Sequence, residues 1–152
     1  MPYTHHRTLR FADTDAAGVI YFATLLSICH EAYEASLIAS GIPLPEFFRS
    51  QTVAIPITQA HIDFHQPLTC GQQLAIQVHP IGQNKPSEFQ IQYQLYRVDR
   101  SELLDPHTRP AAQASTRHVC INPTLRHRQD LPPALRQWLT QWGEPTPQLP
   151  SD

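Results

Sequence analysis

The chain of 152 residues has little of what several functional classes require. Charged residues make up only 16%, Lys85 is the single lysine, and the formal net charge is −2. A nucleic-acid binder needs a concentrated basic face, so this composition argues against that class. The sequence has no apolar run that could span a bilayer and no charged start followed by an apolar segment. We therefore expect a cytoplasmic protein.

The sequence also lacks the motifs of several chemistries. It contains no GxSxG, no GxGxxG and no GxxxxGK[ST], so neither a nucleophile elbow nor a glycine-rich phosphate loop is indicated. The 3 cysteines, Cys29, Cys70 and Cys120, are odd in number, far apart and without a CxxC pair. They indicate no disulfide framework and no zinc site, and we expect mostly buried, reduced thiols.

Apolar periodicity predicts the elements. Alternation over 3–11 predicts a first strand, and a long helix should begin between Phe22 and Thr24 and run to Ser40 before Gly41 and Pro43. A short helical piece is expected over 45–49. Strands are expected within 51–64, 74–78, 89–98 and 111–121, and an amphipathic helix over 132–142. A parity shift near Thr58 and Gln59 predicts a β-bulge or a change of buried face.

This order indicates an α+β fold, in which one strand and one long helix precede four strands in hairpin-like succession. Hydrophobic residues make up 41% of the chain, which is enough for one domain with a real core. We expect a single domain over 1–141 and a flexible, proline-rich tail over 142–152. A polar loop is expected over 101–110.

The most informative segment is RFADTDAAGVIYF, from Arg10 to Phe22. Asp13 and Asp15 end a strand-like segment just before the long helix. The helix start offers backbone N–H groups and the positive end of the helix dipole, which favour developing negative charge. One aspartate is expected to cap the turn while the other faces a cleft. Asp15 is the better candidate for attack on a carbonyl, because the small run ending in Gly18 leaves room for a substrate.

The 9 histidines offer weaker candidates. His61 and His65 do not suit a shared metal, because four residues of a strand span about 13 Å. His61 and Asp63 would share a strand face, where a polar cross-strand position is expected more than a catalytic dyad. His30 lies on the polar stripe of the long helix, and either a hydrogen-bonded core histidine or a functional group fits that place.

The cations leave two interpretations open. Lys85 lies in the turn GQNKPSE, and Arg97, Arg100 and Arg117 lie on or near later strands. They would form a phosphate-binding patch if the substrate carries phosphates, and otherwise they are scattered solvated side chains.

The segment RFADTDAAGVIYFATLLSICHEAYEASL resembles the signature of the hot-dog-fold acyl-CoA thioesterases of the 4-hydroxybenzoyl-CoA thioesterase type, and AHIDFHQPLTCGQQL resembles their second strand. Within that family the chain is most similar to the cyanobacterial and plant-type 1,4-dihydroxy-2-naphthoyl-CoA hydrolases of phylloquinone synthesis. The resemblance implies an antiparallel sheet wrapped around the long helix, and homodimers or homotetramers. It implies an acyl-CoA substrate with no metal or cofactor.

Carried over by position, the catalytic carboxylate falls on Asp15 and the backbone N–H that polarises the thioester carbonyl falls on Phe22. Lys85 lies in the turn that meets the CoA phosphates in relatives. The thioesterase branch associated with the Tol-Pal system carries histidine in place of Phe22 and glutamate in place of His30, so both residues argue against that branch. It stays open whether His30 touches the acyl group or water.

Three rival functions stay open from the sequence. The first is a thioesterase for 4-hydroxybenzoyl or short aliphatic groups. The second is a non-catalytic module that binds acyl-CoA or a partner protein. A dehydratase on the same fold is less well supported, because such sites need a histidine placed differently.

Overall fold

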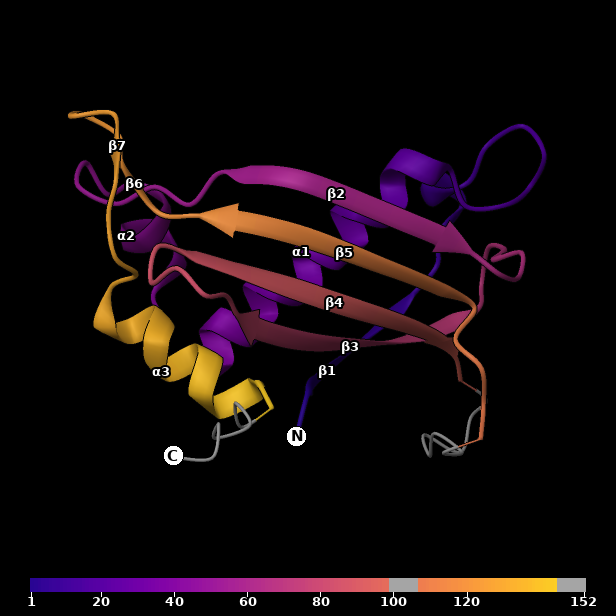
Figure 1. The fold of residues 1–152 in the computed structure, drawn as a ribbon. Helices are drawn as coiled ribbons and strands as arrows, with labels where there is room; N and C mark the ends of the chain where they lie inside the picture. The colour runs from indigo at the N-terminus through magenta and orange to yellow at the C-terminus, as the bar shows by residue number, and fades with distance from the viewer. Residues whose placement is uncertain (99–106, 145–152) are drawn as a thin grey trace.

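A computed structural model of the chain describes residues 1–98 and 107–144 (Figure 1). Most of the expected polar loop over 101–110, together with Arg100, lies outside the described residues. The same holds for residues 145–152 of the expected tail. No helix in the described part of the chain is long and apolar enough to cross a membrane.

The main body is a five-stranded antiparallel sheet with the strand order β1-β3-β4-β5-β2. Its strands are β1 (Tyr3–Thr8), β2 (Ile57–Phe64), β3 (Gln73–Gly82), β4 (Glu88–Arg97) and β5 (Ala112–Val119). The smaller elements are η1 (Phe11–Asp13), α2 (Leu44–Phe48), the pair β6 (Ile121–Asn122) and β7 (His127–Arg128), and α3 (Pro133–Trp142). The α+β class is confirmed.

The long helix α1 (Phe22–Ala39) crosses behind the sheet (Figure 1). Its start and end agree with the prediction from the sequence. Gly41 has φ +79° and donates to the carbonyl of Ile38, while the N–H of Ile42 bonds the carbonyl of Leu37, so the left-handed glycine ends the helix. The buried side chains of α1 are Leu25, Ile28, Cys29, Ala32, Tyr33, Ser36 and Leu37.

Alternation along the strands places every second side chain against α1, on what we call the inner face of the sheet. On β4 these inner residues are Phe89, Ile91, Tyr93 and Leu95, and all are buried. The side chains between them lie on the outer face. The predicted bulge is confirmed, because the register of β2 against β5 shifts between Ile57 and Gln59.

The expected hairpin-like succession of the last four strands is wrong for its first member. β2 pairs with β5 at one edge of the sheet, whereas β3 pairs with β1 and β4. Alternation reports which face a strand buries but not which strand it pairs with, and this pairing spans about fifty residues of sequence. As a result, β2 forms a free edge beside the start of α1.

Helix α3 closes the other end of α1 (Figure 1). The indole N–H of the buried Trp138 donates to Ser36 Oγ at 2.9 Å, and that of Trp142 donates to Ser40 Oγ at 2.8 Å. The ring of Trp142 also contacts Tyr3 on β1, with centroids 5.2 Å apart. The end of α1 is therefore anchored, and its start is the end that opens to a cavity.

Candidate active site

The segment from Leu9 to Tyr21 is tied to the body by backbone hydrogen bonds. Leu9 N–H donates to Gln72 O at 2.8 Å, and Ile20 N–H donates to Leu68 O at 2.7 Å. Within the loop, Tyr21 N–H donates to Asp13 O at 2.9 Å. These bonds hold the loop across the end of the sheet and bring it directly to the first residue of α1.

Asp13 is the aspartate that the loop turns inward. Its carboxylate accepts two hydrogen bonds from the Arg7 guanidinium, at 2.8 and 3.2 Å, and one from Arg10 N–H at 2.8 Å. Burial raises the pKa of Asp13, but the bonds from Arg7 and Arg10 outweigh it, so the pKa lies below its ordinary value. Arg7 Nε also reaches Glu31 on α1 at 2.9 Å. Asp13 thus links β1, the loop and α1.

Asp15 is exposed and lies in a tight turn. One of its carboxylate oxygens accepts Ala17 N–H at 2.8 Å, and its carbonyl accepts Gly18 N–H at 3.0 Å. Gly18 has φ +80°, a conformation that favours glycine, and a Cβ there would meet nothing within 4 Å. The turn therefore exposes the Asp15 side chain, and the space beside Gly18 is open.

Asp15 lines a cavity of about 360 Å³ together with the start of α1 and the end of β2. Phe22 is the first residue of α1, and its side chain lines the same cavity. Tyr21 is the N-cap, it makes no side-chain cap, and the first turn contains no acidic residue. The first N–H groups of a helix have no partner within it, so this end can donate to an anionic oxygen.

Residues 64–68 form the opposite wall of this cavity, and sequence reasoning did not assign them to the site. His65 Nε2 lies 3.1 Å from Gln113 Oε1, and Gln66 accepts a bond from Arg97 at 2.6 Å. The sequence signal that could have identified these residues was the AHIDFHQP segment, which resembles the thioesterase family. Its closeness to Asp15, however, depends on the pairing of β2 with β5.

His30 lies further along α1 and lines a neighbouring cavity rather than that of Asp15. Its Nδ1 pairs with Glu34 at 3.0 Å, and its ring contacts Tyr33 with centroids 5.5 Å apart. Lys85 lies in the exposed turn after β3, at the end of the sheet away from the Asp15 loop. The ten residues of β3 span about 30 Å, so Lys85 does not reach Asp15 of its own chain.

The cations do not form one patch. Arg97 is the last residue of β4 and lies near the Asp15 cavity, whereas Arg117 pairs in register with Gln90 near the start of that strand, which is the end next to the Lys85 turn. The expectation of a joint phosphate-binding patch is therefore wrong for Arg97, while for Arg117 and Lys85 it stays a prediction.

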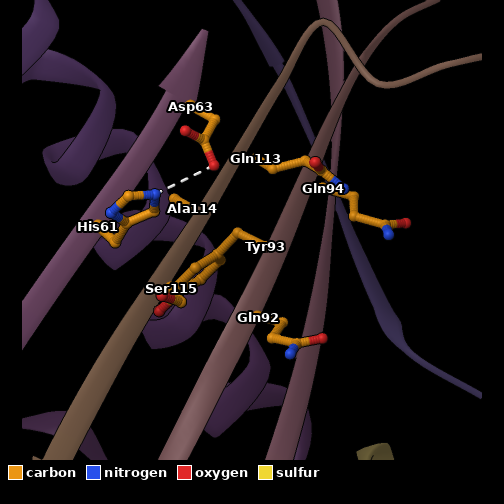
Figure 2. A pocket seen from close by; sticks show the side chains of 8 residues that line it. All are labelled: His61, Asp63, Gln92, Tyr93, Gln94, Gln113, Ala114 and Ser115. Atoms are coloured by element: carbon orange, nitrogen blue, oxygen red, sulfur yellow. Dashed lines mark hydrogen bonds and ion pairs between the residues drawn. The ribbon is translucent and has the colours of Figure 1, made fainter.

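His61 and Asp63 lie on the outer face of β2, away from α1 (Figure 2). They point toward one another, with Nε2 and Oδ2 at 3.1 Å, beside a polar hollow of about 210 Å³ that Ser115 and three glutamines also line. Both side chains are largely exposed. The pair fits the polar cross-strand interpretation.

The described residues contain no group of three or more histidine, cysteine or acidic side chains placed to hold a metal ion. Cys29 and Cys120 are buried and Cys70 is exposed, and none of them forms a disulfide. Burial raises the pKa of Cys29 to about 12, so this thiol stays protonated and is a poor nucleophile. The Asp15 cavity is lined by one carboxylate, that of Asp15, and by the imidazole of His65.

The fold and sequence of this chain have relatives among known proteins. The chain belongs to the thioesterase-like superfamily, whose family model matches residues 9–139. The family resemblance of the Asp13–Asp15 segment is confirmed, and so is the hot-dog fold that it implied.

Two curated relatives are similar over nearly the whole chain. The protein of Rippkaea orientalis is 53% identical over 133 residues, which cover 88% of this chain and 91% of the relative. That of Crocosphaera subtropica is 49% identical over 136 residues, covering 90% of this chain and 94% of the relative. Both bear the name 1,4-dihydroxy-2-naphthoyl-CoA hydrolase.

A solved structure is also similar to this chain in fold and sequence. The crystal structure of a 1,4-dihydroxy-2-naphthoyl-CoA thioesterase from Synechocystis superposes with a TM-score of 0.81 and 31% identity. The match covers 92% of this chain and 96% of that one.

Proposed function

We propose that this protein hydrolyses 1,4-dihydroxy-2-naphthoyl-CoA to 1,4-dihydroxy-2-naphthoate and CoA, a step of phylloquinone synthesis. The observation that carries the proposal is one cavity that joins the Asp15 carboxylate to the uncapped amino end of α1. The names of the relatives in Rippkaea and Crocosphaera supply the acyl group.

In the proposed reaction the thioester carbonyl oxygen points at the Phe22 N–H. The helix end stabilises the oxyanion, and such a donor is typically worth about 3 kcal/mol in the transition state. Gly18 leaves space for the thioester to approach the loop backbone. The bond from Ala17 N–H holds one oxygen of Asp15 and leaves the other to react.

Two routes for Asp15 remain. As a nucleophile it forms a mixed anhydride with the acyl carbon, the C–S bond breaks, and the departing thiolate takes a proton. Water then cleaves the anhydride and restores the carboxylate. As a general base, Asp15 instead removes a proton from the water that attacks the carbonyl directly.

The first test is release of the CoA thiol from a panel of naphthoyl, benzoyl and fatty acyl-CoA esters. We expect the hydroxynaphthoyl ester to have the highest kcat/KM, and Asp15→Asn to lose most of the activity while folding normally. A higher kcat/KM for 4-hydroxybenzoyl-CoA or a short aliphatic ester would replace the proposed substrate. Tight binding without thiol release would instead indicate a non-catalytic acyl-CoA-binding module.

A single turnover in ¹⁸O-labelled water separates the two routes. In the nucleophile route, water that attacks the anhydride at the Asp15 carbonyl carbon leaves the label in the Asp15 carboxylate and none in the first molecule of acid formed. The base route, like attack of water on the acyl carbon of the anhydride, places the label in that acid, so label in Asp15 identifies the nucleophile route. Mass spectrometry of the peptide that contains Asp15 reads the difference.

We also propose that two copies pair through their β2 edges, as a homodimer or as part of a homotetramer. β2 is an edge strand, and exposed apolar side chains lie along it, among them Ile57 and Phe64. Such an edge invites pairing with a second strand. A second copy would be the source of any Lys85 that meets CoA at the Asp15 cavity. A cytoplasmic location stays a prediction.

A further inference from the structure

The cavity that contains His30 and the Asp15 cavity are both lined by α1 and β2. On α1, Leu26 follows Phe22 by four residues and lies on the same side of the helix. On β2, Ala60 and Phe64 both lie on the inner face. Phe22 and Phe64 line the Asp15 cavity, while Leu26 and Ala60 line the second one. We call this second cavity, of about 290 Å³, the distal cavity.

The floor of the distal cavity is polar although it lies over the core. Thr116 lines it, and Thr116 Oγ1 lies 2.8 Å from His118 Nε2. Tyr93 also lines the cavity. Burial raises the pKa of Tyr93, and a hydrogen bond with Thr116 reduces that rise. His118 stacks on Phe89 with ring centroids 4.6 Å apart. Burial and the nearby His30 lower the pKa of His118 to about 4, so the ring is neutral.

Two polar atoms below this floor have no hydrogen-bond partner among the described residues. They are Tyr33 Oη and His118 Nδ1, in side chains whose exposed fractions are both 1%. An unpaired buried polar group costs about 1–3 kcal/mol. Neither side chain lines the distal cavity, but Tyr33 contacts His30 and His118 bonds Thr116, and both of these partners line it. The rings of Tyr33 and His118 lie 5.2 Å apart, which makes one cluster with Thr116.

His30 stands at the rim of the same cavity. Its Nδ1 is engaged by Glu34, so Nε2 is the nitrogen that a ligand can meet. Along α1, the eight-residue step from Phe22 to His30 rises about 12 Å. A hydrogen bond of about 3 Å at each end leaves roughly 6 Å between the two oxygens of the ligand, which is the length of a hydroxyaryl acyl group.

We propose that the distal cavity receives the aryl ring of the acyl group, and that Thr116 and His30 select a ring hydroxyl remote from the thioester. His118 and Tyr33 act as positioning residues, since they orient the Thr116 hydroxyl and the His30 ring from below. This inference rests on the proposed hydrolysis and adds what selects the substrate. A site built to bond a hydroxyl discriminates strongly against the analogue that lacks it.

The test compares two substrates that differ in one group. They are 1,4-dihydroxy-2-naphthoyl-CoA and 1-hydroxy-2-naphthoyl-CoA, which lacks only the remote hydroxyl. We expect the wild-type protein to prefer the first by about 100-fold or more in kcat/KM. Thr116→Val keeps the shape of the side chain and removes its hydroxyl. It should lower kcat/KM for the first substrate about tenfold and change that for the second less than about twofold.

Two further variants keep the test sharp. Ser115→Ala changes the neighbouring residue on the outer face of β5, and both substrates should keep their wild-type kcat/KM. Thr116→Ser retains a hydroxyl and should restore the preference. Equal losses on both substrates in Thr116→Val would mean a structural defect, and no loss on either would mean that Thr116 does not read the hydroxyl. Both results overturn the inference.

The wild-type protein separates this inference from the proposed function. If it hydrolyses both esters with equal kcat/KM, the hydrolase assignment stands and the hydroxyl selection falls. If it releases no thiol from either ester, the proposed function itself fails.

Discussion

Asp13 and Asp15 lie two residues apart, yet their carboxylates face opposite surroundings. Asp13 is 7% exposed and its carboxylate is bound by Arg7, whereas Asp15 is exposed and its carboxylate accepts only the N–H of Ala17 among the described residues. The backbone carbonyl of Asp13 also accepts the N–H of Tyr21, just before α1 begins. One aspartate therefore holds the loop in place, and the other is presented by it.

This division predicts opposite effects for two matched variants. Asp13→Asn weakens the charge-assisted bonds from Arg7 and should lower the free energy of unfolding by about 2 kcal/mol. Asp15→Asn should change that free energy by less than about 0.5 kcal/mol but lower kcat at least about 100-fold. Urea unfolding and thiol release, measured on both variants, check the pair. The reverse pattern would exchange the two roles.

Gly18 carries a second prediction, since its φ of +80° is costly for any residue with a Cβ. Gly18→Ala should lose about 1 kcal/mol of stability, and kcat should fall because the turn that presents Asp15 must readjust. Gly82→Ala is the control, because its Cβ would also meet nothing within 4 Å but its φ is not in the left-handed region. Thermal melts and thiol-release rates compare the two. Equal effects would remove the conformational argument.

Features set by neighbours in the sequence were predictable. The start of α1 at Phe22, its end before Gly41 and the bulge after Ile57 each follow from a few adjacent residues. The inward turn of one aspartate also follows, because a tight loop after a strand separates its two carboxylates.

Features set by pairing between distant residues were not predictable. The place of β2 beside β5 decides that Phe64 and His65 face Asp15, and alternation contains no information on partners. Likewise, the family resemblance assigned the turn around Lys85 to the CoA phosphates. The sequence did not reveal how far this turn lies from Asp15, because that distance depends on the direction of β3. The polar cluster of Thr116 and His118 was missed because an alternating strand ASTRHV predicts only which side chains point inward.

The cysteines give a third prediction, which also matters for the activity assay. Cys70 is exposed, while Cys29 and Cys120 are buried, and burial raises the pKa of both buried thiols. Ellman's reagent should therefore modify one thiol rapidly in the native protein and all 3 in denaturant. Cys70→Ser should abolish the rapid phase and remove the background in CoA release. Rapid modification of a second thiol would contradict the burial of the other two.

The pH dependence of stability supplies a fourth prediction. The pKa of His118 falls from 6.5 to about 4 on folding, chiefly because burial disfavours the charged ring. The unfolded chain then binds a proton that the folded chain refuses, so stability is complete above about pH 6.5 and declines toward pH 4. His118 alone accounts for about 3 kcal/mol of this loss at most.

His118→Gln and His118→Phe remove the titrating ring and should make the stability profile less steep between pH 6.5 and 4.5, where the slope that remains comes from His79, whose pKa burial also lowers. Asp13 does not interfere in this window, because its pKa lies below its ordinary value of 3.8. Urea unfolding at several pH values makes the comparison. A slope equal to that of the wild-type protein would show that another group controls the acid side.

The last prediction concerns Lys85, which serves the Asp15 cavity only if a second copy brings it there. The protein should then sediment at two or four times 17.3 kDa. Lys85→Gln should raise KM for the CoA ester with little change in kcat, because it removes one contact to a phosphate. A mixture of Asp15→Asn and Lys85→Gln subunits decides the matter. In a mixed dimer, Asp15 of one subunit meets Lys85 of the other, so about a quarter of all sites recover wild-type kinetics. If Lys85 acted within its own chain, no mixed dimer would contain an intact site, and the mixture would never exceed the sum of its two parts.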